Sequence, residues 1–167
     1  MMTTYFSLPK LLLVFCVGLL FCLPLAAQTA APDSLAKDQA AVKDVVNALF
    51  AAMKNADTLS LKACFSPSSI LQSVARDKQG KTLVRQDGLA AFSASVGQLS
   101  PGRADERIQF ASVLVDGDLA TVWTPYRFYL DGKFSHCGAN SFQLVRIEGQ
   151  WKIQYLIDTR RRNGCAE

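Results

Sequence analysis

The pattern of apolar and polar residues predicts a long helix in the first part of the chain. From Leu35 to Ala56, apolar side chains recur every three or four positions and fall on one side of a helical projection, with charged side chains on the other. Such a stripe is typical of a helix that packs one face against a core. Its apolar members are Leu35, Val42, Val45, Val46, Leu49, Phe50 and Met53.

Shorter elements follow this helix. The stretch TLSLKACF predicts a second helix with Thr58 as its N-cap, and GLAAFSASVGQL predicts a third helix capped by Asp87. Between them, SILQSVARDKQGKTLVR alternates apolar and polar residues around Gly80, which predicts a strand hairpin.

Beyond residue 106 the apolar period changes to two, which is the spacing of strands. Four strand-like runs cover residues 107–115, 119–130, 134–147 and 151–158. Their connections, DGD, DGK and EGQ, are short and contain glycine, which favours antiparallel hairpins. Helices followed by a meander of strands predict an α+β fold.

The first 27 residues have the pattern of a secretory signal peptide. Lys10 precedes an apolar run from Leu11 to Leu23, and small residues follow that run. The run is shorter than the roughly 20 apolar residues of a membrane span. We expect cleavage after Ala27, a flexible lead-in over residues 28–34 and one domain over residues 35–167. The mature protein is then exported, periplasmic or extracellular, without a stable membrane anchor.

Charge and cysteine content narrow the class of protein further. The formal net charge of +4 falls to +3 once Lys10 leaves with the leader, and no basic stripe is present, so a nucleic-acid partner is not expected. Cleavage leaves three cysteines, Cys64, Cys137 and Cys165. In an oxidising compartment three cysteines favour one disulfide and one free thiol.

The order of elements resembles the nuclear transport factor 2-like superfamily over roughly residues 36–160. The resemblance rests on NADTLSLKACF, VRQDGLAAF and the closing FQLVRIEGQWKI hairpin. Within the superfamily, TPYRFYLDGKFSHCGANSFQLVRIEGQWKI and DTRRRNGC are most similar to exported bacterial proteins labelled putative lumazine-binding. The resemblance implies a cystatin-like cone, in which a curved antiparallel sheet wraps around N-terminal helices and encloses a pocket. The superfamily spans isomerases, cyclases, dehydratases and non-catalytic binders, so the fold does not decide the function.

The single histidine, His136, stands beside Cys137, which raises the question of a thiol–imidazole active site. A two-residue turn at Glu148-Gly149 places His136 and Asn140 on the core face of the last hairpin and Cys137 on the opposite face. Neighbouring strand side chains point apart, so His136 and Cys137 are not expected to form a catalytic pair. The same register pairs Arg146 with Trp151, Leu144 with Ile153, Phe142 with Tyr155, Asn140 with Ile157 and Cys137 with Arg160.

A disulfide between Cys137 and Cys165 is the expected use of the outward thiol. Asn163-Gly164 is a strong turn dipeptide that can fold the tail back over the strand. A bridge from Cys137 to Cys64 is the alternative pairing.

The candidate ligand-binding residues are His136, Asn140, Trp123 and Tyr129. The first two offer polar contacts in an apolar cavity, and the aromatic pair shares a face by parity. Pro125 interrupts that strand, so the parity beyond it stays open.

No carboxylate is expected inside the pocket. Several aspartates lie in predicted turns, and Asp158 alternates onto the face opposite His136, where it would pair with the following arginines. The carboxylate base of superfamily isomerases therefore has no evident counterpart. Arg160 to Arg162 are expected to form a solvated, salt-bridging tail, and a patch that binds phosphate or lipid headgroups is the alternative. With one histidine and no ligand cluster, no metal or other cofactor is expected.

These expectations favour non-catalytic binding of a small apolar or aromatic molecule in the cone. A homodimer through the outer sheet face is expected, because Val145 and Leu156 place apolar side chains there. One alternative is a ketosteroid-isomerase-like or cyclase-like enzyme with His136 as general base. Another is a structural or protein-interaction module of the envelope with a filled cone.

Overall fold

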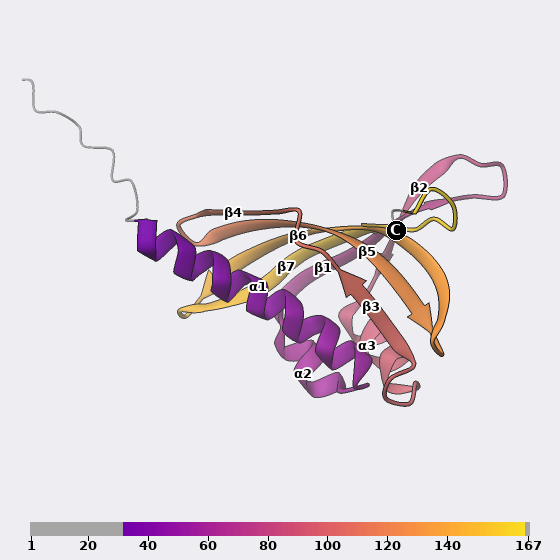
Figure 1. Ribbon diagram of the computed structural model, residues 1–167, viewed down its shortest axis with the longest axis horizontal. Coiled ribbons are helices and arrows are strands. Elements are labelled where there is room, and N and C mark those ends of the chain that lie inside the picture. Colours follow the sequence, from indigo (N-terminus) through magenta and orange to yellow (C-terminus); the bar gives the residue numbers. More distant parts are fainter. Residues whose placement is uncertain (1–31, 166–167) are drawn as a thin grey trace, which may run out of the picture.

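The computed structural model describes residues 32–165, which form three helices and one curved sheet (Figure 1). The helices are α1 (Pro32–Lys54), α2 (Thr58–Ala63) and α3 (Leu89–Gly97). The predicted signal peptide and residues 28–31 of the predicted lead-in lie outside the described residues. The expected lead-in is wrong for residues 32–34, because α1 begins at Pro32. Proline suits the first helical position, and Asp33 complements the positive end of the helix.

The starts of α2 and α3 differ from expectation. Asp57 rather than Thr58 caps α2, because its side chain accepts hydrogen bonds from the backbone N–H groups of Leu59 and Ser60 at 3.1 and 3.0 Å. Gly88 is the N-cap of α3, and no side chain caps that helix. Asp87 is therefore not a capping residue.

The sheet has seven strands in the order β2-β1-β7-β6-β5-β3, with β4 also paired to β5. β1 pairs with β7 in parallel, and every other pair is antiparallel, so the sheet is mixed rather than wholly antiparallel as expected. The strands are β1 (Phe65–Arg76), β2 (Thr82–Asp87), β3 (Ala104–Ile108), β4 (Ser112–Asp116), β5 (Leu119–Leu130), β6 (Lys133–Ile147) and β7 (Gln150–Thr159).

The strand expected over residues 107–115 is divided in two. β3 pairs with the second half of β5 and β4 with its first half. Between them, the N–H groups of Gln109 and Ala111 donate to the carbonyls of Pro125 and Trp123, each at 3.0 Å. The break lets the sheet edge bend around the helices.

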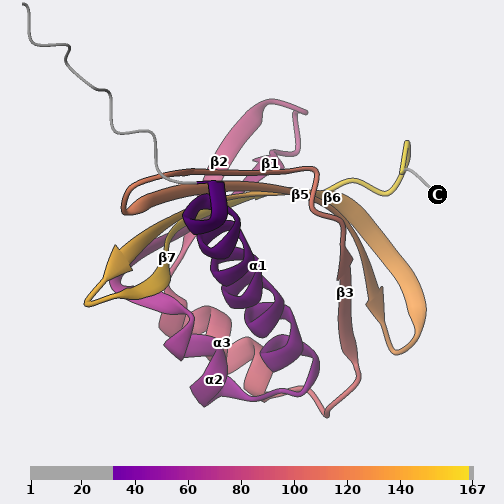
Figure 2. The same ribbon diagram turned by 60° about the vertical axis from the view of Figure 1, so that its left-hand side comes forward.

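The core lies between α1 and the concave face of the sheet, which curls around the helix in Figures 1 and 2. Val42, Val46 and Leu49 on α1 are buried, as are Phe142 and Leu144 on β6. Full burial of such side chains contributes about 1.5–3 kcal/mol each. The apolar stripe predicted for the first helix therefore faces the sheet.

A bulge in β7 changes the predicted register of the last hairpin. Leu144 opposes Ile153 as expected, but Gln143 then opposes Tyr155, which leaves Gln154 as an extra residue. The Gln154 side chain is held by β1. It accepts a hydrogen bond from the Ser66 hydroxyl at 2.7 Å and donates one to the Ser68 carbonyl at 3.1 Å.

Beyond the bulge, the residues of β7 face the opposite way from the prediction. Phe142 opposes Leu156, not Tyr155, and Asn140 opposes Asp158, not Ile157. Leu156 and Asp158 therefore face the interior of the cone instead of the outer face. Beyond the end of β7, the backbone of Cys137 likewise pairs with Arg161 rather than with Arg160, in an isolated antiparallel β-bridge.

Candidate functional site

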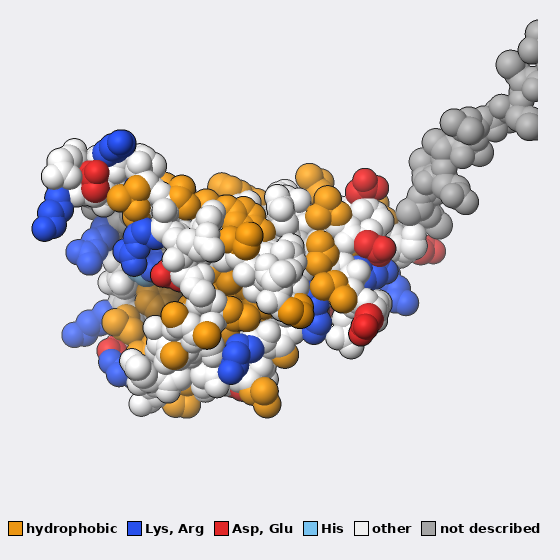
Figure 3. All heavy atoms as spheres, turned by 180° about the vertical axis from the view of Figure 1, so that it is seen from behind, with side chains coloured by type: hydrophobic (Ala, Val, Ile, Leu, Met, Phe, Trp, Pro, Cys, Tyr) orange, Lys and Arg blue, Asp and Glu red, His pale blue; other side chains and the backbone are white. Residues whose placement is uncertain are grey.

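The cone encloses a cavity of about 440 Å³ between α1, α3 and the concave face of the sheet. Figure 3 shows a hollow with apolar side chains inside and basic side chains around its rim. Its apolar lining comes from Leu49, Phe50, Met53, Leu71, Ala91, Phe92, Val96, Leu99, Ala104, Tyr126, Phe128 and Leu156. Its polar lining comes from Gln72, Ser73, Arg85, Asp87, Ser95, Glu106, His136, Asn140, Asp158 and Arg160.

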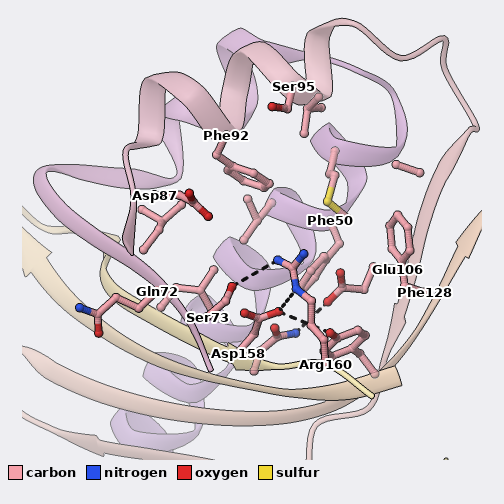
Figure 4. A pocket seen from close by; sticks show the side chains of 18 of the residues that line it. Phe50, Gln72, Ser73, Asp87, Phe92, Ser95, Glu106, Phe128, Asp158 and Arg160 are labelled. Atoms are coloured by element: carbon pink, nitrogen blue, oxygen red, sulfur yellow. Dashed lines mark hydrogen bonds and ion pairs between the residues drawn. The ribbon is translucent and has the colours of Figure 1, made fainter. Parts of the chain in front are cut away.

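Glu106 and Asn140 form the polar centre of the cavity. The Asn140 amide Nδ2 donates to Glu106 Oε1 at 2.8 Å and lies 3.4 Å from Thr124 Oγ1. Asn140 and Thr124 are both buried. Figure 4 shows Glu106 among the aromatic rings of Phe50 and Phe128. The carboxyl group therefore lies beside aromatic rings and has one strong hydrogen-bond partner, with Asp158 and Arg160 in the same cavity.

The pKa of Glu106 is raised from 4.5 to about 7. Burial is the main cause, because a low-dielectric surrounding disfavours the charged carboxylate. The hydrogen bond from Asn140 opposes this rise, whereas the nearby charge of Asp158 adds to it and Arg160 opposes it. A carboxyl group with such a pKa can both give and take a proton at neutral pH.

A second polar group joins β7 to the pocket wall. Arg160 donates from Nε to Asp158 Oδ2 at 2.7 Å, and its NH2 group lies 3.4 Å from Ser73 Oγ (Figure 4). The Tyr126 hydroxyl donates to the Thr159 carbonyl at 2.9 Å and lies 3.4 Å from Asp158 Oδ2. Burial and the Asp158 charge raise the pKa of Tyr126, so this hydroxyl stays protonated.

His136 lies at the edge of the cavity against two aromatic rings. Its ring centroid is 4.9 Å from that of Phe128 and 5.7 Å from that of Tyr126. Ser135 Oγ lies 3.1 Å from Nδ1. Burial and the positive charge of Arg160 lower the pKa of His136, so the imidazole is neutral at neutral pH.

The structure separates the four predicted binding residues into two groups. His136 and Asn140 line the cavity, and their role in binding stays a prediction. Trp123 and Tyr129 do not line it, so their prediction as lining residues is wrong. Trp123 is on the outer face and 44% exposed. Tyr129 follows a register shift in β5 and stacks on the Arg107 guanidinium, 4.2 Å from its ring centroid.

Three carboxylates line the cavity, Asp87, Glu106 and Asp158, so the expectation that none would lie there is wrong. Asp158 faces inward because of the bulge at Gln154. The side chain of Gln154 is held by Ser66 and Ser68, which are distant in sequence, so local alternation does not reveal the bulge. Asp158 does pair with Arg160, as expected. The inward position of Glu106 could have been predicted from the sequence, because Glu106 shares one face of β3 with the apolar residues Ala104 and Ile108.

The expected disulfide between Cys137 and Cys165 is present, with Cα atoms 5.8 Å apart. Cys64 is buried with a free thiol that donates to the Ser60 carbonyl at 3.3 Å. Burial raises the pKa of this thiol, which keeps it protonated and unreactive. The alternative Cys137–Cys64 pairing is therefore wrong.

The described residues offer neither a metal site nor a membrane-spanning helix. Within residues 32–165, no three acidic, cysteine or histidine side chains gather as a metal site would require. None of the described helices has the length and apolar character needed to cross a membrane.

Comparisons with known proteins bear on the family and the fold. The profile of a family described as "Putative lumazine-binding" matches residues 37–155. No curated protein matches the chain.

Several solved structures have a similar fold. A nuclear transport factor 2-like protein of unknown function from Shewanella baltica has 15% identity and a TM-score of 0.60, over 77% of this chain and 97% of that one. One from Silicibacter pomeroyi has 21% identity and a TM-score of 0.60, over 75% and 98%. A ketosteroid isomerase-like protein from Erwinia carotovora has 14% identity and a TM-score of 0.55, over 74% and 96%. At these identities the likeness establishes the nuclear transport factor 2-like, cystatin-like fold alone.

Proposed function

Because the chain belongs to the family described as putative lumazine-binding, we propose that its cone binds one small, mainly apolar or aromatic molecule. The observation that carries this proposal is the 440 Å³ cavity, which has apolar walls and a few convergent polar groups. Small-molecule sites have this composition and volumes of about 300–1,000 Å³. Such a cavity argues against the alternative of an envelope module with a filled cone.

Glu106, Asn140 and His136 are the proposed polar contacts. Below pH 7 the Glu106 carboxyl is mainly protonated and can donate to a carbonyl, whereas above pH 7 it accepts from an N–H or O–H group. The ligand is therefore expected to combine a flat or aliphatic body with one hydrogen-bonding group. A neutral probe should bind at both protonation states.

Fluorescence titration with N-phenyl-1-naphthylamine, a neutral apolar probe, tests the proposal. Ala91 on α3 is exposed at the cavity wall, and Ala91→Trp is expected to obstruct it and weaken binding at least tenfold. Ala90→Trp is the matched control, because Ala90 is exposed on the same helix but does not line the cavity. Equal binding by both variants, or no binding by the unmodified protein, would overturn the proposal.

Native mass spectrometry of the mature protein from its own host identifies the natural ligand. A small molecule that is released on unfolding would supply its mass. The intact mass also reports the disulfide through the loss of two hydrogens.

Proton transfer by Glu106 is a second candidate function, favoured by the pKa of about 7 in an apolar cavity. His136, the base proposed from the sequence, has a lowered pKa and is the weaker base of the two. The test is deuterium exchange at the carbon beside the carbonyl of a bound model ketone, followed by NMR. Glu106→Gln is expected to abolish exchange without abolishing binding, whereas His136→Gln retains it. Retention of exchange by Glu106→Gln would reject Glu106 as the base.

A homodimer through the outer sheet face remains part of the proposal. Leu114, Leu119 and Trp123 are exposed on β4 and β5, where they can pack against a second copy. Sedimentation should give twice the monomer mass for the unmodified protein and the monomer mass for Trp123→Glu.

Export is likewise proposed. The basic and apolar leader over residues 1–27 and the Cys137–Cys165 disulfide both support an oxidising compartment. N-terminal sequencing from an extracellular or periplasmic fraction should begin at Gln28.

A further inference from the structure

A second hollow, of about 340 Å³, adjoins the mouth of the cone. It is lined by Ser135, His136, Arg160, Arg161 and Arg162. His136 and Arg160 also line the cone cavity, so the two spaces share a wall. A ligand group that lies against His136 and Arg160 in the cone is therefore next to the hollow.

The hollow carries a concentrated positive charge. Arg160 is partly neutralised by its ion pair with Asp158 at 2.7 Å. Among the residues that the structure describes, no carboxylate lines the hollow, and Arg161 and Arg162 form no ion pair. Arg160 and Arg162 both lower the pKa of the adjacent His136, as positive charges do. The three arginines are exposed and Arg160 is salt-bridged, as expected from the sequence, but Arg161 and Arg162 leave two guanidinium charges without a carboxylate partner among the described residues.

The backbone that carries these arginines is fixed to the sheet. Cys137 and Arg161 exchange backbone hydrogen bonds at 2.9 and 2.8 Å. Four residues beyond Arg161, the Cys137–Cys165 disulfide closes the segment. Guanidinium groups on a fixed segment lose less conformational entropy when they bind an anion than those on a free tail.

We propose that this hollow binds the anionic group of the ligand whose apolar body occupies the cone. This inference rests on the proposed function and narrows the ligand to an amphiphile with a terminal carboxylate or phosphate. Guanidinium groups bind both oxyanions through charge-assisted, often bidentate, hydrogen bonds. The disulfide then serves binding as well as stability.

Two fluorescent probes with the same aromatic body test the proposal. N-phenyl-1-naphthylamine is neutral, and 8-anilinonaphthalene-1-sulfonate adds one anionic group. The anionic probe is expected to bind the oxidised protein about tenfold more tightly than the neutral one. Arg161→Ala/Arg162→Ala should remove that difference and leave the affinity for the neutral probe unchanged.

A matched variant separates local contacts from overall charge. Lys78→Ala/Lys81→Ala removes the same two charges from the exposed β1–β2 hairpin, whose residues do not line the hollow. It should retain the preference for the anionic probe. An equal loss of preference in both double variants would overturn the proposal, because it would indicate general attraction by net charge.

Opening the disulfide gives an independent measurement. Cys137→Ser/Cys165→Ser is expected to lose most of the preference for the anionic probe, while neutral-probe binding reports that the cone remains folded.

Displacement of the sulfonate probe by 1-naphthoate or by 1-naphthyl phosphate then distinguishes a carboxylate site from a phosphate site. Displacement by neither would overturn the proposal.

The outcomes also separate this inference from the proposed function. If the neutral probe binds without any preference for the anionic one, the cone is a binding site and the anion site is rejected. If neither probe binds, both proposals fail.

Discussion

Asn140 donates a hydrogen bond of 2.8 Å to Glu106 and so links β6 to β3, although β5 lies between these strands in the sheet. The bond spans the polar centre of the cavity over the buried Thr124 of β5. It is the main interaction that favours the charged form of Glu106, and burial outweighs it. The two residues therefore hold a carboxyl group whose protonation changes close to neutral pH.

The ionisation of Glu106 should make the stability of the folded protein depend on pH. The pKa of Glu106 rises from 4.5 to about 7 on folding, so the folded state binds more protons than the unfolded state between these values. The contribution of this bound proton to the free energy of unfolding is fully present below pH 4.5 and is lost as the pH rises to 7. Its size is at most about 3 kcal/mol. Glu106→Gln should make the free energy of unfolding, measured by urea denaturation at pH 5 and pH 8, less dependent on pH.

His136 is the internal control for that comparison. Its pKa is lowered, so the histidine destabilises the folded state as the pH falls and opposes the effect of Glu106. Since Glu106→Gln retains His136, the difference between the two proteins isolates the carboxyl group. An unchanged pH dependence would contradict the raised pKa.

The hairpins and the inward face of β6 could be predicted because local chemistry determines them. Both residues of the Asp131-Gly132 and Glu148-Gly149 turns have positive φ, of 52° and 72° and of 50° and 77°. Such turns match the twist of the flanking strands and set the register near them. That local register was sufficient to place His136, Asn140 and Cys137 correctly.

The acidic part of the cavity could not be predicted as readily. The bulge that turns Asp158 inward depends on bonds from Gln154 to Ser66 and Ser68, which lie 88 and 86 residues away in sequence. Trp123 was misplaced for a different reason. Its strand is continuous through Pro125, but the face that meets the core contains Val122 and Thr124, so Trp123 points outward.

The second prediction separates inward from outward aromatic residues. Phe128 lines the cavity and packs on His136, whereas Trp123 is on the outer face. Phe128→Ala should weaken binding of N-phenyl-1-naphthylamine about 2- to 10-fold, the value of one aromatic contact. Trp123→Ala should leave that affinity unchanged. A loss with Trp123→Ala instead would place the binding site outside the cone.

The third prediction concerns the close packing at Gly138. A Cβ atom there would lie 1.7 Å from the Thr159 carbonyl oxygen and 2.7 Å from Cε1 of Tyr126. Backbone cannot yield as a flexible side chain can, so Gly138→Ala should lower the free energy of unfolding by about 3 kcal/mol or more. Gly88→Ala is the control, because a Cβ there meets no atom within 4 Å and φ is −77°. Equal stability of the two variants in urea would contradict the packing.

The fourth prediction concerns the disulfide and its effect on the tail. The bridge joins residues 28 positions apart, and a loop of that length contributes about 3–4 kcal/mol by restricting the unfolded chain. Reduction should lower the free energy of unfolding by that amount in the unmodified protein, measured in urea with and without dithiothreitol. For Cys137→Ser/Cys165→Ser, the free energy of unfolding should be the same with and without dithiothreitol, because this variant has no disulfide to reduce.

A variant of Cys64 shows whether dithiothreitol acts on the Cys137–Cys165 disulfide alone. The Cys64 thiol is buried and free, so Cys64→Ala should leave the response to dithiothreitol unchanged, although the lost side chain costs about 1 kcal/mol by itself. Loss of the response in Cys64→Ala would mean that Cys64 takes part in the crosslink in solution. Since the tail lies against Cys137 through the backbone of Arg161, reduction should also speed amide exchange there before the sheet opens.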